Sequence, residues 1–66
     1  MKFTFIGAGS FGFTRKLITD MLTFPALQDA EYCLMDIDPV KLGYIKQAVE
    51  KIVAQGNYPA KVTSTL

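Results

Sequence analysis

The chain has 66 residues, half of them apolar and a fifth charged, a composition typical of one small globular domain. Seven basic and six acidic residues leave a net charge of +1 and form no runs, so we expect neither a nucleic acid nor a membrane as partner. Histidine is absent and Cys33 is the single cysteine, which excludes an internal disulfide, a Cys/His metal site and a Ser/His/Asp triad within these residues. A lone cysteine also favours a reducing, cytoplasmic location.

The first part of the chain predicts a strand followed by a helix. Residues 2–6 are mostly aromatic or β-branched and run into Gly7, which is typical of a buried strand. From about Ser10 to Phe24 apolar residues recur at helical spacing. The face expected to be buried consists of Phe13, Leu17, Ile18, Met21 and Leu22. Pro25 is expected to end this helix, because the residue before a proline avoids the α conformation.

A second strand and a second helix are predicted next. Residues 31–36 indicate another buried strand. Asp38 and Pro39 then form a helix start, because aspartate caps free amides and proline is well tolerated at the first helical position. Gly56 is expected to end this helix in a left-handed conformation. The apolar face of the helix consists of Leu42, Ile45, Val49, Ile52 and Val53.

Residues 60–66 alternate like a third strand, so the predicted order is β-α-β-α-β. This alternation implies an α/β fold with a three-stranded parallel sheet, a partial Rossmann fold. Because no helix follows the last strand, we expect residues 1–66 to be the N-terminal half of an NAD-binding Rossmann domain, a fragment of a longer enzyme. Apolar surface is then expected beside the first strand, where it would favour self-association.

The glycine pattern G-x-G-x-x-G occurs as GAGSFG, between the first predicted strand and the first predicted helix. Alone it is a weak signal, but this position is the one that dinucleotide binding requires. Gly7 allows a tight turn, Gly9 lets the backbone approach a pyrophosphate, and Gly12 permits close packing of helix and strand. We expect the amides of Ser10, Phe11 and Gly12 to face the phosphates from the positive end of the helix dipole.

Asp36 ends the second predicted strand, 24 residues after Gly12. An acidic residue at this place binds the hydroxyls of the adenosine ribose, and its charge repels a 2′-phosphate, so NAD is favoured over NADP. The nearby Lys41 can soften this preference. The alternative, in which the glycines make only a turn and Asp36 is a solvated strand end, fits the combined placement less well.

Structural roles are preferred for the other conspicuous side chains. Asp38 is interpreted as a helix cap rather than a ligand, and Cys33 as a small buried residue rather than a reactive thiol. Arg15 and Lys16 are assigned to a solvated helix face. Three aromatic or aliphatic residues are assigned to packing: Phe24, Leu27 and Tyr32.

Beyond the glycine pattern, the sequence resembles the N-terminus of glycoside hydrolase family 4, the NAD- and Mn²⁺-dependent α-glycosidases that include α-galactosidases and α-glucosidases. The resemblance rests on FIGAGS, FPAL, LMDIDP and KIV, which occur in this order, and on helix residues such as Leu17, Ile18 and Leu42. It extends over essentially the whole chain. FIGAGS combined with LMDIDP is more specific than the glycines alone, although neither segment identifies the sugar.

The resemblance implies hydrolysis of O-glycosidic bonds by redox and elimination rather than by two carboxylates. NAD⁺ would take a hydride from carbon 3 of the sugar, and a base would remove the acidified proton at carbon 2 with Mn²⁺ stabilising the enolate. Elimination, addition of water and return of the hydride would complete the cycle. The family's metal ligands and base lie later in a longer chain, so the resemblance implies no catalytic residue and no metal ligand here. We also expect an α-glycoside substrate and a homo-oligomer.

Only the dinucleotide positions carry over from the family to this sequence. At the pyrophosphate they are Gly7, Gly9, Ser10, Phe11 and Gly12, and at the adenosine ribose they are Asp36 and the backbone of Ile37. The 66 residues alone are therefore expected to bind the dinucleotide weakly and not to catalyse. Two alternatives remain open: a fragment of an NAD-dependent dehydrogenase of small hydroxy or sugar acids, and a stand-alone nucleotide-sensing module.

Overall fold

Strands and helices alternate along the chain as predicted. A computed structural model describes all of residues 1–66. Its elements are β1 (Lys2–Ile6), α1 (Phe11–Met21), the short 3-10 helix η1 (Pro25–Leu27), β2 (Glu31–Met35), α2 (Pro39–Gln55) and β3 (Lys61–Thr65). The three strands form one parallel sheet in the order β1-β2-β3, which confirms the predicted fold class.

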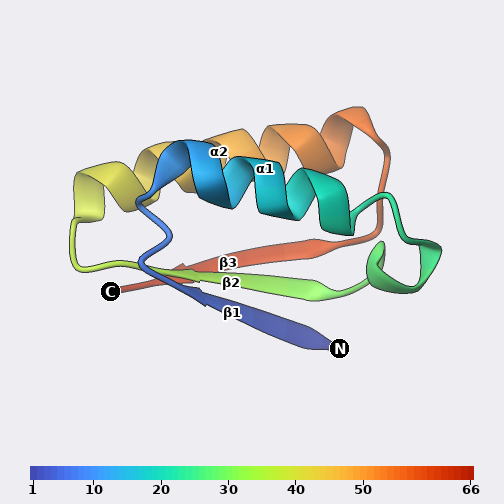
Figure 1. Cartoon of the computed structure of the whole chain (residues 1–66), viewed down its shortest axis with the longest axis horizontal. Helices are drawn as coiled ribbons and strands as arrows, with labels where there is room; N and C mark the ends of the chain where they lie inside the picture. Colours follow the sequence, from blue (N-terminus) through green and yellow to red (C-terminus); the bar gives the residue numbers. More distant parts are fainter.

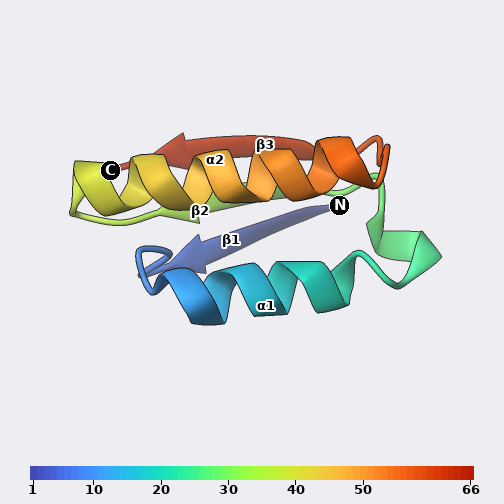
Figure 2. The same ribbon diagram turned by 90° about the horizontal axis from the view of Figure 1, so that it is seen from above.

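Both helices lie on one face of the sheet (Figure 1). Seen from above, α2 runs over the β2 and β3 side while α1 runs beside β1 (Figure 2). Two consecutive crossovers of the same hand, made in the same direction, produce this one-sided arrangement. The strands were expected to be buried, but the opposite face of the sheet is bare. In β1 only Phe3 and Phe5 are partly buried, and Ile6 is 83 % exposed.

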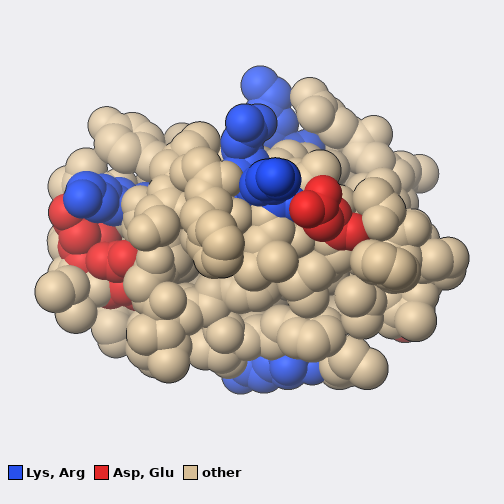
Figure 3. All heavy atoms as spheres, viewed as in Figure 1, with Lys and Arg blue, Asp and Glu red and all other residues tan.

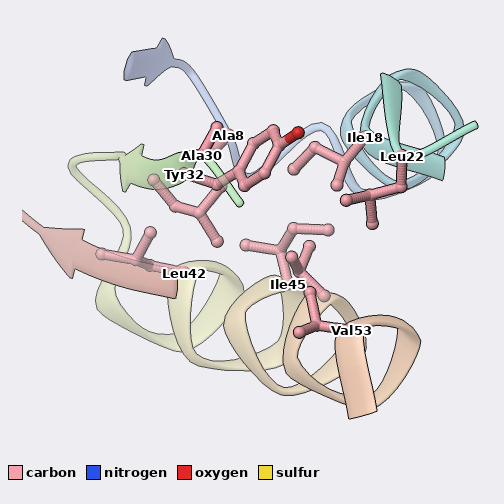
Figure 4. Packing of buried hydrophobic residues seen from close by; sticks show 10 residues of the cluster. Ala8, Ile18, Leu22, Ala30, Tyr32, Leu42, Ile45 and Val53 are labelled. Carbon is pink, nitrogen blue, oxygen red and sulfur yellow. The ribbon is translucent and has the colours of Figure 1, made fainter. Parts of the chain in front are cut away.

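The core lies between the sheet and the two helices and centres on Tyr32 of β2 (Figure 4). The Tyr32 ring is fully buried, stacks on Phe3 with ring centroids 5.9 Å apart, and donates its hydroxyl to the Leu27 carbonyl at 2.7 Å. Burial raises the pKa of this hydroxyl, with a smaller contribution from the charge of Asp29. The packing role predicted for Tyr32 is thus confirmed. Leu27 takes part through its backbone carbonyl, and Phe24 is exposed.

The buried face of α1 differs from the predicted one. Ile18 and Leu22 are buried and Met21 packs against the core, as predicted. Phe13 and Leu17 are 71 % and 39 % exposed, and Thr14 is buried in their place. The Thr14 hydroxyl donates to the Ala8 carbonyl at 3.1 Å, so a polar residue occupies the inner face with its hydrogen bond satisfied. Phe13 and Leu17 instead line a cleft of about 540 Å³ along the unpaired edge of β1.

The ends of both helices need smaller corrections. The helix α1 ends at Met21, before Pro25, which begins η1 instead. The predicted apolar face of α2 and its Asp38 cap are confirmed, because the Asp38 carboxylate accepts from the amides of Val40 and Lys41.

The left-handed residue after α2 is Asn57, with φ 56°, and not Gly56, whose φ is −83°. A short polar side chain tolerates this region of φ, so asparagine can make the turn. Gly56 is needed for a different reason: a Cβ there would collide with the ring of Tyr58.

Charged groups of both signs are dispersed over the face shown in Figure 3 and form no continuous basic surface. Arg15 and Lys16 are exposed, as predicted. Cys33, predicted to be buried, is half-buried because it lies on the helix-free face of the sheet. Neither helix has the length and apolar character needed to cross a membrane.

Candidate functional site

The glycine loop joins β1 to α1 at the carboxyl end of the sheet, where both helices also begin (Figure 1). Gly7 has φ +77°, a conformation that side chains rarely adopt, so it makes the tight turn that the sequence predicted. The amides of Gly7 and Ala8 both donate to the Met35 carbonyl, at 2.9 and 3.0 Å. These bonds tie the start of the loop to the end of β2.

Asp36 follows β2 immediately and lies against the same loop. Its Oδ2 accepts from the Gly9 amide at 2.7 Å, and its Oδ1 accepts from the Asp38 amide at 2.9 Å. The hydrogen bond from Asp38 is the main cause that lowers the pKa of Asp36, followed by the one from Gly9, with a smaller contribution from the charge of Lys41. The carboxylate is therefore ionised, and since it offers about four acceptor positions it retains free ones for a ligand.

Gly9 is enclosed by the chain's own side chains. A Cβ at this position would lie 2.6 Å from Asp36 Oδ2, 3.0 Å from Asp36 Cγ and 3.1 Å from Lys41 Cβ. The position therefore needs a glycine because of the Asp36 carboxylate beside it. This reason is separate from the close approach of a pyrophosphate that the sequence predicted. This contact could not be predicted from the sequence, because no local signal connects two residues that are 27 positions apart.

The first turn of α1 carries unpaired donors. Ser10 makes no side-chain cap, and the amides of Phe11, Gly12 and Phe13 donate to no group of the chain. The amide of Ser10, expected among the free donors, is engaged by the Gly7 carbonyl at 3.2 Å. The free amides and the helix dipole make this end of α1 suited to an anion.

Gly12 does not have the packing role that was predicted. A Cβ at this position would meet nothing within 4 Å, because Gly12 lies on the exposed side of the first turn. The first turn of α1 is instead joined to the preceding loop by Thr14, whose hydroxyl donates to the Ala8 carbonyl.

A cleft of about 420 Å³ opens where β1, β2 and β3 end. Asp36 supplies its one charged group, and the neighbouring Ile37 side chain is 95 % exposed. This combination suits a flat, largely apolar group that carries hydroxyls. The structure thus brings Gly7, Asp36 and Ile37 together, whereas Ser10 lines the separate cleft beside β1. The cleft at the strand ends is lined by Ile6, Gly7, Met35, Asp36, Ile37 and Leu66.

Comparison with known proteins identifies the family. The model of the family described as family 4 glycosyl hydrolase matches residues 2–66. The chain belongs to glycosyl hydrolase family 4. An alpha-galactosidase of Rhizobium meliloti (strain 1021) is 45 % identical over 64 residues, and an alpha-galactosidase of Bacillus subtilis (strain 168) is 36 % identical over 63 residues.

These alignments cover 97 % and 96 % of this family 4 chain but only 13 % and 15 % of the respective relatives. The chain therefore spans a small part of the length of the curated proteins it matches. The predicted resemblance is confirmed.

For family 4 the resemblance also implies Mn²⁺. No three Cys, Asp or Glu side chains converge in a way that could hold a metal ion. The residues present therefore do not fit the metal. The start of α1 does fit the phosphates of a dinucleotide, because the amides of Phe11, Gly12 and Phe13 are free there.

Proposed function

We propose that this family 4 chain is the N-terminal half of the NAD-binding domain of a longer α-galactosidase. The proposal is carried chiefly by one observation: the ionised Asp36 is bonded to the Gly9 amide, beside the open amides of α1. An acidic group at the end of the second strand next to such a loop is the arrangement that recognises an adenosine ribose and its pyrophosphate.

Each proposed contact has a physical reason. Gly7 and Gly9 shape the loop, and the amides of Phe11 and Gly12 would hold the pyrophosphate, with the Ser10 hydroxyl beside them. Asp36 and the backbone of Ile37 would hold the adenosine ribose.

The negative charge of Asp36 would repel the 2′-phosphate of NADP, so NAD is the preferred dinucleotide. When bound, this cofactor supplies hydride acceptance, while these residues only bind and orient it.

The activity proposed for the whole protein is hydrolysis of an α-galactoside by the NAD- and Mn²⁺-dependent redox and elimination route. The names of the two relatives favour galactose over glucose. Family membership favours this glycosidase over the dehydrogenase alternative. We propose no catalytic residue in these 66 residues, and a stand-alone sensing module remains the non-enzymatic alternative.

The test is an assay of the intact gene product on nitrophenyl α-galactoside and α-glucoside, with and without NAD⁺ and Mn²⁺. Galactoside cleavage that requires both additions is expected. Cleavage that is indifferent to NAD⁺ would overturn the proposal. The intact mass of the native product distinguishes the proposed enzyme from the sensing module. A native protein near the 7.3 kDa of this chain would support the sensing module.

A further inference from the structure

The middle of the glycine loop is attached to the rest of the molecule through Asp36. Its start is held by the bonds from Gly7 and Ala8 to Met35, and α1 begins with the bond from Thr14 to Ser10. Between these two anchors, the sole acceptor for the Gly9 amide is the Asp36 carboxylate.

We propose that Asp36 is a positioning residue for this loop, in addition to any contact it makes with a ribose. Its carboxylate fixes Gly9 and so sets the path by which the loop enters α1, before a ligand arrives. The functional consequence of this role rests on the dinucleotide binding proposed above.

The carboxylate is itself fixed from the other side. Oδ1 accepts from the Asp38 amide at 2.9 Å, and Asp38 caps α2 through its bonds to Val40 and Lys41 at 3.0 and 3.1 Å. Rotation of the Asp36 side chain would break the bond at Oδ1, so Oδ2 is held toward Gly9. A continuous set of hydrogen bonds thus runs from the start of α2 to the loop that precedes α1.

The space around Gly9 is already closed without a ligand. A methyl group there would meet Asp36 Oδ2 at 2.6 Å and, on another side, Lys41 Cβ at 3.1 Å. Because both neighbours are fixed to the start of α2, any side chain at this position must displace the carboxylate and break its bond to the loop. The effect of a substitution at Gly9 should therefore depend on whether residue 36 is an aspartate.

A ligand pair separates positioning from direct contact with the ribose. ADP carries both ribose hydroxyls, and 2′,3′-dideoxy-ADP carries neither, while the pyrophosphate is the same. If Asp36 acts only on the hydroxyls, Asp36→Asn lowers the affinity for ADP and leaves the affinity for dideoxy-ADP unchanged. If Asp36 also positions the loop, the affinity for dideoxy-ADP falls too. We expect a loss of about threefold or more, which corresponds to one lost hydrogen bond.

This titration is done on the intact gene product, with Asp38→Asn as the matched control. Asparagine caps helices about as well as aspartate, so Asp38→Asn removes the same charge nearby while keeping its bonds. Loss of a negative charge alone strengthens binding of an anion, so weaker binding of dideoxy-ADP by Asp36→Asn has no such electrostatic origin. Unchanged or tighter dideoxy-ADP binding in Asp36→Asn would overturn the positioning role.

A second measurement needs no ligand. The melting temperature is compared among the parent, Gly9→Ala, Asp36→Ala and the double variant, with Gly12→Ala as the control for adding a methyl group to the loop. We expect Gly9→Ala to lower the melting temperature less in the Asp36→Ala background, because the collision is gone. Additive shifts would overturn the positioning role, whereas failure of ADP to bind at all would overturn the proposed function and leave this result standing.

Discussion

Asp36 is held in its charged form by backbone amides rather than by a buried ion pair. The amide of Asp38 contributes most and that of Gly9 next, and both lower the pKa of the Asp36 carboxyl. Lys41 adds a weaker attraction from the first turn of α2, while partial burial acts in the opposite direction. A carboxylate of this kind keeps its charge across the neutral range, as the proposed contact with a ribose requires.

This lowered pKa predicts an acid-dependent loss of stability. Because the pKa of Asp36 is lower in the folded than in the unfolded chain, its stabilisation is fully present above the unfolded value of about 4 and is lost as the pH falls through the folded value. Unfolding measured over this window should therefore depend less on pH in Asp36→Asn than in the parent. A carboxyl carbon resonance of Asp36 that titrates at or above the ordinary value would contradict this expectation.

Replacement of the charge should also change the choice of dinucleotide. In Asp36→Asn we expect NAD⁺ affinity to fall about tenfold, since hydrogen bonds to a charged acceptor are lost. NADP⁺ should bind more tightly than in the parent, because the repulsion is removed and Lys41 remains close by. Calorimetry with both cofactors checks this, and adding Lys41→Ala should cancel the gain for NADP⁺. A tenfold loss for both cofactors would contradict the proposed discrimination.

Much of the candidate site was predictable at the scale of single residues, because each role has a local signal. Gly7 precedes a helix and follows a strand, and Asp38 stands before a proline. The contact between Gly9 and Asp36 was not predictable, because it depends on how the start of α2 lies against the loop. That arrangement is fixed by packing of the whole unit.

At the scale of an element, the orientation of α1 also could not be predicted from local sequence. Helical spacing placed Phe13 and Leu17 on the buried face together with Ile18 and Leu22, but the structure buries only the latter pair. Rotation of the helix about its axis is instead fixed by Thr14, whose hydroxyl donates to the Ala8 carbonyl. A threonine on the inner face gives no hydrophobic signal, so the sequence pattern could not reveal it.

The hydrogen bond of Thr14 should therefore contribute to the stability of the fold. Thr14→Val keeps the side-chain shape but leaves the Ala8 carbonyl without its donor, and we expect a loss of about 1–2 kcal/mol in the free energy of unfolding. Thr19→Val is the matched control, because the Thr19 hydroxyl donates to the Arg15 carbonyl on the exposed face of the same helix. Denaturant unfolding of the two variants compares them directly. Equal losses would contradict the structural role of Thr14.

Gly43 inside α2 and Gly56 just after it predict opposite effects of the same substitution. Gly43 lies inside the helix with open space around its Cβ position, so Gly43→Ala should raise the free energy of unfolding by about 1 kcal/mol. Gly56→Ala should lower it, because the new methyl group would collide with the ring of Tyr58. Thermal unfolding distinguishes the two. A stabilising Gly56→Ala would mean that the Tyr58 ring moves aside without loss of packing.

At the scale of the whole molecule, the sheet has one covered and one bare face. Near the start of the strands the bare face is polar, with Glu31 paired to Lys2 at 3.7 Å and in register with Lys61. Toward the strand ends it carries Ile6 and Met35. The apolar surface that the sequence predicted beside β1 is therefore present, because a β-α-β-α-β unit with both helices on one side cannot cover it.

This exposed edge predicts concentration-dependent self-association of the 66-residue chain. Ile6 and Phe13, 83 % and 71 % exposed, flank the unpaired edge of β1, whose free amides and carbonyls can pair with another strand. Ile6→Lys should shift the chain toward the monomer, because a charge on an edge strand opposes such pairing. Sedimentation equilibrium over a range of concentrations measures the shift. Tyr44→Lys is the control, since Tyr44 is a similarly exposed apolar residue on α2. A mass that does not vary with concentration in the parent, or an equal effect of both lysines, would show that the β1 edge does not drive association.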